Sequence, residues 1–329
     1  MHTFATGTVP TRSATPFVRI DVGSSADAQD VVGIAGHFAR EHGATDGRGE
    51  LALEAAGLWA NAMAGTGGGQ LCIRVLAGAR PTLETTAVAT LPIRFPCPGG
   101  FADTLVDQWS GPQGAAAHAS PAADGPAVRY GVAQHTFRGG YFCGDSWAVS
   151  AHNDAVSAII VDGLGHGASA CLAAARGVAA FCQQPLQDPV GLASSVHEAM
   201  QGTVGGVGAL SLWSRAAGVL HYCGLGDTTG RLIGEQKSAL ASNPGIFGVR
   251  TPRLRAFAHQ VRHGLLVLHT DGLRARWQLD DYPGLSSCHP ALIAAVLHRD
   301  FARATDDGTV LVVALEQSTA SDSMASGHP

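Results

Sequence analysis

Residues 144–163 have the sequence GDSWAVSAHNDAVSAIIVDG, and this stretch decides the fold of the second half of the chain. Two apolar, strand-like segments flank Asn153-Asp154, a dipeptide typical of a two-residue hairpin turn. Residues equidistant from such a turn pair with each other, so Asp145 lies directly opposite Asp162, with Cβ atoms about 5 Å apart. A slip of one residue would place them on opposite faces. The sequence therefore predicts an antiparallel hairpin that brings two carboxylates together.

Two further aspartates stand at strand ends farther along the chain. Asp271 follows the apolar run LLVLHT, and Asp306 comes just before the run TVLVVAL. If these strands are antiparallel neighbours, joined through a helix predicted over 289–302, both aspartates lie at the same end of the sheet. Bare carboxylates so close repel one another unless a cation lies between them. Oxygen-only ligation suits Mg²⁺ or Mn²⁺. We therefore expect two such ions, about 3.5–4 Å apart, that activate a water molecule.

The turn after the hairpin, Asp162-Gly163-Leu164-Gly165-His166-Gly167, is rich in glycine and leads into a predicted helix over 168–181. Glycine lets the backbone approach a metal or a phosphate closely, so the Gly163 carbonyl is a candidate further oxygen ligand. His166 is a candidate phosphate contact or general acid, and the alternative is a solvent-facing residue at the helix start.

Simpler interpretations apply to each of these residues. An Asp-Gly pair is by itself most often a turn, and the argument depends on four acidic strand ends within one stretch of the chain. Asp307 is expected to be a structural neighbour of Asp306. His269, inside a predicted strand, is expected to be a core histidine with satisfied hydrogen bonds.

The composition narrows the class of protein. The 329 residues are 46% hydrophobic and 14% charged with a net charge of −5, which favours a packed core and disfavours nucleic-acid or anionic-membrane partners. The seven cysteines form no C-x-x-C pair, which argues against a disulfide framework or a zinc site and fits a cytoplasmic location. No signal peptide or membrane-spanning segment is expected.

The pattern of segments predicts two domains. The stretch GPQGAAAHASPAADG is interpreted as a linker because it is rich in Ala, Gly and Pro. The expected parts are a flexible arm over 1–15, a small α/β domain over 16–110, the linker over 111–125, an α+β domain over 126–316 and a disordered tail over 317–329.

Four segments carry a resemblance to a known family. GGYFCGDSWAV, VDGLGHGASA, LHTDGL and TDDGTVLVV resemble, in order and spacing, the motifs of SpoIIE-like type 2C protein phosphatases, and the RsbX-like variety in particular. GLGDTTGRL and SNPGIFG are similar to the internal strand and flap of that family. The resemblance covers about 126–316. His269 departs from the pattern, since a serine is commoner there.

The resemblance implies a four-layer αββα sandwich and a metal-dependent protein serine/threonine phosphatase. Asp145 and Asp162 would bind one or both ions together with the Gly163 carbonyl, and Asp271 and Asp306 would complete the second site. The implied reaction is hydrolysis of phosphoserine or phosphothreonine by a metal-activated water. The implied substrate is a phosphorylated regulatory protein of bacterial stress or sigma-factor signalling, such as an anti-sigma antagonist or a stressosome-type scaffold.

The N-terminal half resembles a different family. EAAGLWANAMAGTGGGQL is similar to a helix of the RsbT-like anti-sigma-factor kinases, which have a histidine-kinase-type ATPase fold. Leu58 stands where that family needs its metal-binding Asn, Asn61 is three residues too late, and Pro96 takes the place of the adenine-binding Asp. We therefore expect a truncated, degenerate relative that serves docking or dimerisation.

Two other functions remain open at this point. One is a pseudophosphatase, catalytically weak or inactive, that acts as a binding module in the same pathway. The other is a protein kinase that works through the N-terminal domain, which the missing Asn and Asp positions disfavour. Binding of two cations would distinguish the phosphatase from the module, and binding of ATP would indicate the kinase.

Overall fold

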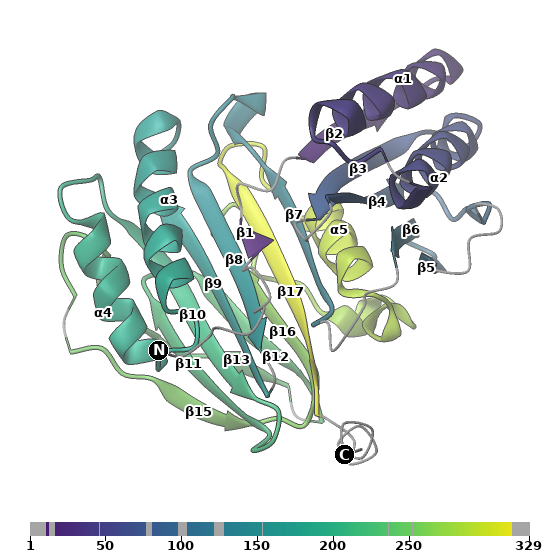
Figure 1. Cartoon of the computed structure of the whole chain (residues 1–329). Coiled ribbons are helices and arrows are strands. Elements are labelled where there is room, and N and C mark those ends of the chain that lie inside the picture. Colours follow the sequence, from purple (N-terminus) through teal and green to yellow (C-terminus); the bar gives the residue numbers. More distant parts are fainter. Residues whose placement is uncertain are drawn as a thin grey trace, which may run out of the picture.

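The computed structural model describes residues 11–12, 17–45, 47–76, 81–97, 104–121, 128–152, 154–235, 237–251 and 253–317. Within these residues the strands form three sheets, and the layers of the molecule follow one another in a simple order (Figure 1). Helices α3 and α4 cover the first sheet, which stacks on the second; α5 covers the second sheet; beyond α5 lie the N-terminal sheet and then α1 and α2.

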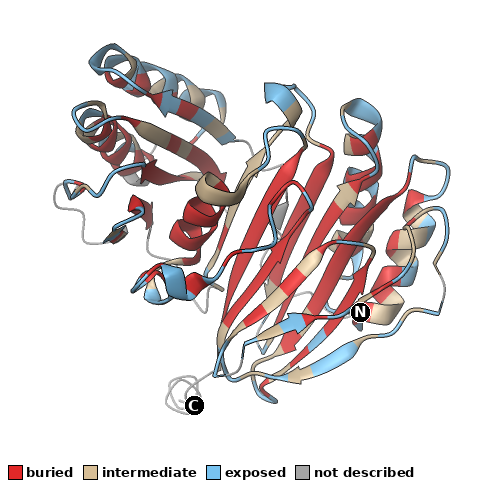
Figure 2. Cartoon of the chain, turned by 180° about the vertical axis from the view of Figure 1, so that it is seen from behind, coloured by how far each residue is buried: buried red, intermediate tan, exposed pale blue. Residues whose placement is uncertain are grey.

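The C-terminal unit contains two stacked sheets. The first has β8 (Asp145–His152), β9 (Ala155–Gly163), β10 (Gly206–Ser214) and β11 (Val219–Leu225) in this order, with β14 (Ser242–Asn243) and β15 (Phe257–Gln260) beside β11. The second has the order β13 (Ser238–Leu240), β12 (Thr229–Gly234), β16 (His263–His269), β17 (Gly308–Glu316) and β7 (Tyr130–His135). Their facing side chains form one buried core, seen as the red central strands in Figure 2. The predicted αββα sandwich is confirmed.

Local sequence signals set the ends of the helices of this unit. Helix α4 (Pro189–Met200) has proline at its first position, and the Asp188 side chain accepts hydrogen bonds from two backbone N–H groups of the first turn. Helix α5 (Pro290–Phe301) also begins with proline, after His289, whose side chain accepts from Ala291 N. Helix α3 (Ala168–Gln183) follows the glycine-rich turn that leaves β9.

The N-terminal unit is a smaller sheet covered by two helices. Its strands lie in the order β2 (Phe17–Val22), β3 (Gly69–Leu76), β4 (Thr82–Ala89), β6 (Gly114–Pro121) and β5 (Thr104–Gly111), all antiparallel. Helices α1 (Ser25–Glu41) and α2 (Gly47–Ala64) pack on one face of this sheet around Trp59 and many small side chains. A capping box between Ser24 and Asp27 starts α1.

The predicted linker over 111–125 is wrong for 114–121, because these residues form β6 between β4 and β5 in the N-terminal sheet. The alanines suit this place because the strand is buried on both faces. Ala115, Ala117 and Ala119 face the α1/α2 side, and Ala116 faces α5. The N-terminal unit therefore extends past residue 110 to Pro121, and residues 122–127 lie outside the described residues.

Helix α5 joins the two units into one body. Its residues from Pro290 to His298 are all buried, since one side packs on β7 and β17 and the other on β4, β5 and β6. Hydrogen bonds cross the same interface, including Arg299 Nη1 to the Ala89 carbonyl at 2.8 Å and the Trp109 indole N–H to the Pro283 carbonyl at 3.0 Å. A helix that is apolar all round is expected in such a position.

The two chain ends were predicted to be flexible, and the structure describes only a little of each. Residues 11–12 form β1, which pairs with β8 at Ala148 and Val149, so the arm predicted over 1–15 is wrong there. Residues 1–10, 13–16 and 318–329 lie outside the described residues. None of the described helices is long and apolar enough to cross a membrane.

Candidate metal centre

The hairpin of β8 and β9 brings the first two aspartates together. Asp145 pairs directly with Asp162 in the antiparallel register, and His152 pairs with Ala155 next to the turn. The predicted register is confirmed, although Asn153 of the turn lies outside the described residues. Both carboxylates therefore stand at the same end of the first sheet.

The second sheet brings a third aspartate to the same place. Strands β16 and β17 are antiparallel neighbours, as expected, and α5 connects them. Asp271 follows β16, and its charge acts on Asp162. Asp306 precedes β17, and its charge acts on both Asp162 and Asp271. The structure thus gathers the four predicted aspartates at one edge of the two sheets.

Asp145 is the most deeply placed carboxylate of the cluster, with 2% of its surface exposed. Its Oδ2 accepts a hydrogen bond of 2.9 Å from the Thr270 hydroxyl, which in turn accepts one from Thr309 N. Its Oδ1 is buried and has no hydrogen-bond partner among the described residues. A buried carboxylate oxygen without a donor is costly, and a cation would satisfy it.

Burial, and then the charges of neighbouring carboxylates, raise the pKa of the aspartates in the cluster. Burial raises the pKa of Asp145 to about 7, with the hydrogen bond from the Thr270 hydroxyl opposing the shift and the charges of Asp307 and Asp271 adding to it. Burial also raises the pKa of Asp162 to about 9, and the charges of Asp145 and Asp271 act in the same direction. The pKa of Asp271 is raised for similar reasons. So much negative charge in one place favours a bound cation.

Asp307 has the structural role that the sequence suggested. Its Oδ1 accepts from Phe137 N at 2.8 Å and its Oδ2 from Gly144 N at 2.9 Å. The carboxylate therefore ties β17 to the loop between β7 and β8. Asp306 Oδ1 accepts from the backbone N–H of Asp307 at 2.9 Å, which orients its own carboxylate.

Gly163 is the last residue of β9, and His166 lies in the turn that follows it. A Cβ on Gly163 would come within 2.2 Å of the Ala170 carbonyl oxygen, so only glycine allows α3 to start this close to the strand. His166 is exposed, and its ring stacks on Phe137 with centroids 4.6 Å apart. Because Asp307 holds Phe137, His166 is positioned at the rim of the cluster rather than among the carboxylates.

His269 is a core histidine, as predicted. It is fully buried, with Nδ1 2.9 Å from the Thr270 carbonyl and Nε2 3.2 Å from the Trp277 indole nitrogen. The indole N–H can only donate, so Nε2 accepts and Nδ1 carries the proton. Burial lowers the pKa of His269 to about 4, which keeps the ring neutral.

Sequence reasoning missed two residues at the site. Asp227 is exposed after β11, and its charge raises the pKa of both Asp162 and Asp271. The signal was present, because Gly226-Asp227 also follows an apolar strand run. Thr270 was the other, and nothing in the sequence distinguished its buried hydroxyl from that of an ordinary strand residue.

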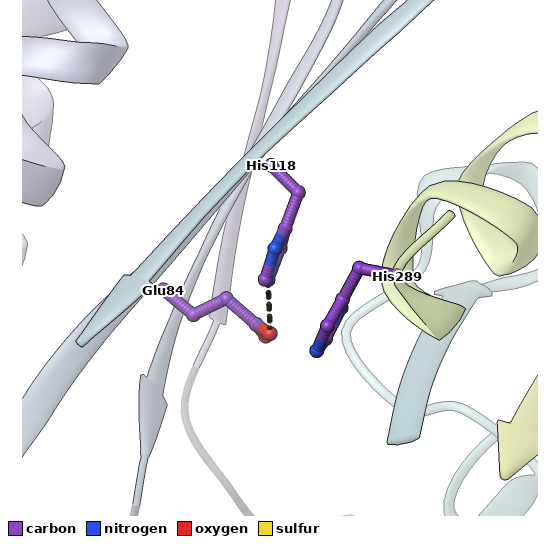
Figure 3. Close-up of side chains that lie close together, drawn as sticks. All are labelled: Glu84, His118 and His289. Atoms are coloured by element: carbon purple, nitrogen blue, oxygen red, sulfur yellow. Dashed lines mark hydrogen bonds and ion pairs between the residues drawn. The ribbon is translucent and has the colours of Figure 1, made fainter. Parts of the chain in front are cut away.

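A second cluster of ionisable side chains lies between the two units (Figure 3). Glu84, His118 and His289 are, among the described residues, three side chains whose ligand atoms all lie within 4.8 Å of one another. However, the His118 and His289 rings stack in parallel, 7° apart in plane, so their lone pairs do not converge on one ion. Glu84 is also bound to Arg74 Nε at 2.8 Å and to His118 Nε2 at 2.8 Å. We interpret Glu84, His118 and His289, together with Arg74, as a buried ionic cluster and not as a metal site.

The N-terminal unit offers little support for nucleotide binding. The Asn61 amide donates to the Gly57 carbonyl of its own helix at 2.9 Å, and the Pro96 carbonyl accepts from the Trp59 indole at 2.9 Å. Both groups are thus engaged within the unit. The resemblance of 16–110 to the anti-sigma-factor kinases stays a prediction.

The fold and the place of the cluster define a class of structure: the C-terminal unit has the fold of the type 2C protein phosphatases. Comparison with protein-family models finds no match, and comparison with curated proteins finds none.

Individual solved structures carry this likeness. RsbX in complex with magnesium has a TM-score of 0.53 at 18% identity, over 59% of this chain and 98% of that one. The PP2C phosphatase domain with a fragment of the regulatory domain of SpoIIE from Bacillus subtilis has 0.50 at 20% identity, over 72% and 79%. A structure reported for the bacterial stressosome has 0.54 at 22% identity, over 57% and 99%.

Proposed function

We propose that this chain is a metal-dependent protein serine/threonine phosphatase. The observation that carries the proposal is the direct pairing of Asp145 with Asp162, next to Asp271, in a fold of the type 2C phosphatases. A structural protein has no reason to keep carboxylates whose pKa values are raised to about 7 and about 9 by burial and mutual repulsion. Such a cluster is expected where charge is needed for function.

The residues fit a pair of hard divalent cations, Mn²⁺ or Mg²⁺. The donors are oxygen atoms only, and a cation would satisfy the buried Oδ1 of Asp145, which has no hydrogen-bond partner among the described residues. We assign Asp145, Asp162, the Gly163 carbonyl, Asp271 and Asp306 as the ligands of two such ions. RsbX binds magnesium, which supports the choice of metal.

The chain's own groups would prepare the site for phosphoryl transfer to water. Bound cations supply electrostatic stabilisation of the phosphoryl oxygens and acidify a water molecule. Thr270 fixes the carboxylate of Asp145, and Asp307 fixes the loop that carries Phe137. We assign to His166 a contact with the phosphate or the donation of a proton to the leaving serine oxygen, and its stacking on Phe137 supports this role.

The proposed substrate is a phosphorylated regulatory protein of a bacterial signalling pathway in the cytoplasm. Support comes from the solved structures with this fold, which include SpoIIE, described as a cell fate determinant, and a structure reported for the bacterial stressosome. Stress or sigma-factor regulation is the pathway we infer, and a dimer through the N-terminal unit stays a prediction.

The decisive experiment measures hydrolysis of p-nitrophenyl phosphate and of serine-phosphorylated casein with Mn²⁺ or Mg²⁺ added after chelation. We expect metal-dependent activity, and a loss of about 10³-fold or more in Asp162→Asn and Asp271→Asn, since each removes a ligand. A matched control is Asp154→Asn in the exposed turn of the same hairpin.

Two outcomes would oppose the proposal. Full activity in Asp271→Asn would refute the assigned ligand. Binding of two cations by calorimetry without hydrolysis of either substrate would instead identify a pseudophosphatase that acts as a binding module.

A further inference from the structure

A groove of about 790 Å³ lies beside the aspartate cluster and is built from both units. Asp145 and Ser146, at the start of β8, form part of its floor. One wall is the loop of residues 136–143, and the other is β2 of the N-terminal unit, which contributes Phe17, Arg19 and Asp21. A single phosphoserine side chain would fill only a small part of this volume. The groove therefore has room for several residues of a bound chain.

Exposed aromatic side chains line the groove. Tyr141 is fully exposed at 101%, Phe142 at 54% and Phe17 at 39%. Large aromatic side chains gathered on a concave surface are typical of sites that bind another chain. They come from both walls, so a ligand between them would contact both units at once.

The charges of the groove complement an anionic ligand. Arg19 and Arg138, on opposite walls, supply two guanidinium groups. Asp21 is the acidic residue of the β2 wall, and its carboxylate already accepts a hydrogen bond of 2.7 Å from Gln70. Guanidinium groups recognise phosphate and carboxylate strongly. Apart from Asp21 and the floor at Asp145, the charged side chains of the lining thus favour a segment with negative charge.

Arg138 is held in an unusual conformation. It has φ 51° and ψ 27°, and among the described residues it is the non-glycine residue with positive φ. The Asp307 carboxylate fixes the preceding Phe137 N–H, and the guanidinium stacks over the Phe137 ring at 5.0 Å. Backbone strain of this kind persists where the surroundings impose it and gathers at binding sites. The loop is therefore a preformed wall.

The β2 wall is an edge strand of the N-terminal sheet, paired only with β3 among the described residues. Ile20 and Val22 point into the core of the N-terminal unit. Because side chains alternate along a strand, Phe17, Arg19 and Asp21 point the other way, into the groove. The N-terminal unit thus contributes Phe17, Arg19 and Asp21 to the groove beside the aspartate cluster of the C-terminal unit.

We propose that this composite groove docks the phosphoserine-bearing segment of a protein substrate, and that Phe17 and Arg19 select segments with aromatic and acidic residues near the phosphoserine. This inference rests on the proposed phosphatase function. It gives the N-terminal unit a direct part in substrate choice.

The test compares two phosphoserine decapeptides, both with Phe beside the phosphoserine, one with flanking Glu and the other with flanking Lys. In wild type we expect kcat/KM for the Glu peptide to exceed that for the Lys peptide by about tenfold, the effect of one favourable charge pair at a recessed site. Arg19→Glu should reverse this preference, while Arg19→Lys should keep it. Phe17→Ala should lower kcat/KM for both peptides relative to p-nitrophenyl phosphate.

Arg40→Glu is the matched control, because it makes the same charge change at an exposed site on α1 of the same unit. Equal kcat/KM for the two peptides in wild type, or an unchanged preference in Arg19→Glu, would overturn the docking inference. In either case metal-dependent hydrolysis of p-nitrophenyl phosphate would leave the phosphatase function standing. Absence of that hydrolysis would overturn the phosphatase function and the docking inference with it.

Discussion

At the scale of single residues, the aspartate cluster opposes folding in the absence of a cation. Asp145 and Asp162 keep their protons to about pH 7 and about pH 9 in the folded chain, whereas an ordinary Asp loses its proton near 3.8. Between about pH 4 and about pH 9 the folded state therefore binds more protons than the unfolded state. The contribution of these groups to stability therefore falls as pH rises from about 4 to about 9.

The first prediction follows from this fall in stability with rising pH. Asp162→Asn should raise the stability of the metal-free protein near pH 8 by about 1 kcal/mol or more. At this pH the folded chain still holds a proton on Asp162 that the unfolded chain has lost, which costs ~1.4 kcal/mol for each pH unit above the ordinary pKa of Asp. The same substitution should abolish the stabilisation that Mn²⁺ gives to wild type. Thermal unfolding with chelator and with Mn²⁺ measures both effects, and a destabilised metal-free variant would contradict the argument.

The second prediction concerns pH directly. The rise in Tm that saturating Mn²⁺ produces should be larger at pH 8 than at pH 5, since protons compete with the cation for Asp145 and Asp162 at the lower pH. Thermal unfolding across this range, with free Mn²⁺ held constant, tests it. An equal rise at both values would show that other groups dominate cation binding.

The third prediction concerns the ionic cluster between the units. Arg74 is buried, is bound to Glu84 and lies over the rings of Tyr130 and Trp147 at 5.1 and 5.5 Å. Burial alone would raise the pKa of Glu84, but Arg74 and His118 hold it well below the usual range. Glu84→Gln leaves the guanidinium without its counter-charge, so we expect a loss of about 3 kcal/mol.

Chemical denaturation measures that loss, and Glu316→Gln is the control. Glu316 pairs with Arg129 at the surface, where both side chains are about half exposed, and its removal should cost less than about 1 kcal/mol. Similar losses for the two variants would show that the buried cluster contributes no more than a surface pair.

At the scale of elements, the sequence predicted the strands that carry the aspartates and missed β6. The hairpin of β8 and β9 could be placed because a two-residue turn and alternating apolar residues together fix a register. Strand β6 has almost only small residues, and composition does not distinguish a close-packed buried strand from a linker. The groove could not be predicted from the sequence either, because β2 and the loop at 136–143 come together only when the two units pack against each other.

The fourth prediction tests the buried state of β6. Ala117 is fully buried and packs toward α1 and α2. Ala117→Leu should destabilise the chain by about 1–3 kcal/mol, because there is no room for the added atoms. The control is Ala216→Leu in the exposed turn after β10, which should have little effect. If residues 111–125 were a solvated linker, both variants would unfold like wild type.

At the scale of the whole molecule, the two units share α5 and are expected to unfold together. The fifth prediction is that the full chain gives one cooperative transition in calorimetry. A fragment of residues 128–317 should self-associate, because the side of α5 that packs on Val88, Trp109 and Ala116 would then face water. A monomeric fragment with the Tm of the full chain would contradict this interdependence.

The fluorescence of Trp109 can report whether the N-terminal and C-terminal units are in contact. Trp109 belongs to the N-terminal sheet, yet its indole N–H donates a hydrogen bond to the Pro283 carbonyl of the C-terminal unit. Its ring also packs against that of Tyr282, with centroids 5.9 Å apart. Separation of the two units would expose the indole ring to water and shift its fluorescence emission to longer wavelength. With the other four tryptophans replaced by phenylalanine, fluorescence would follow the parting in real time without an added dye.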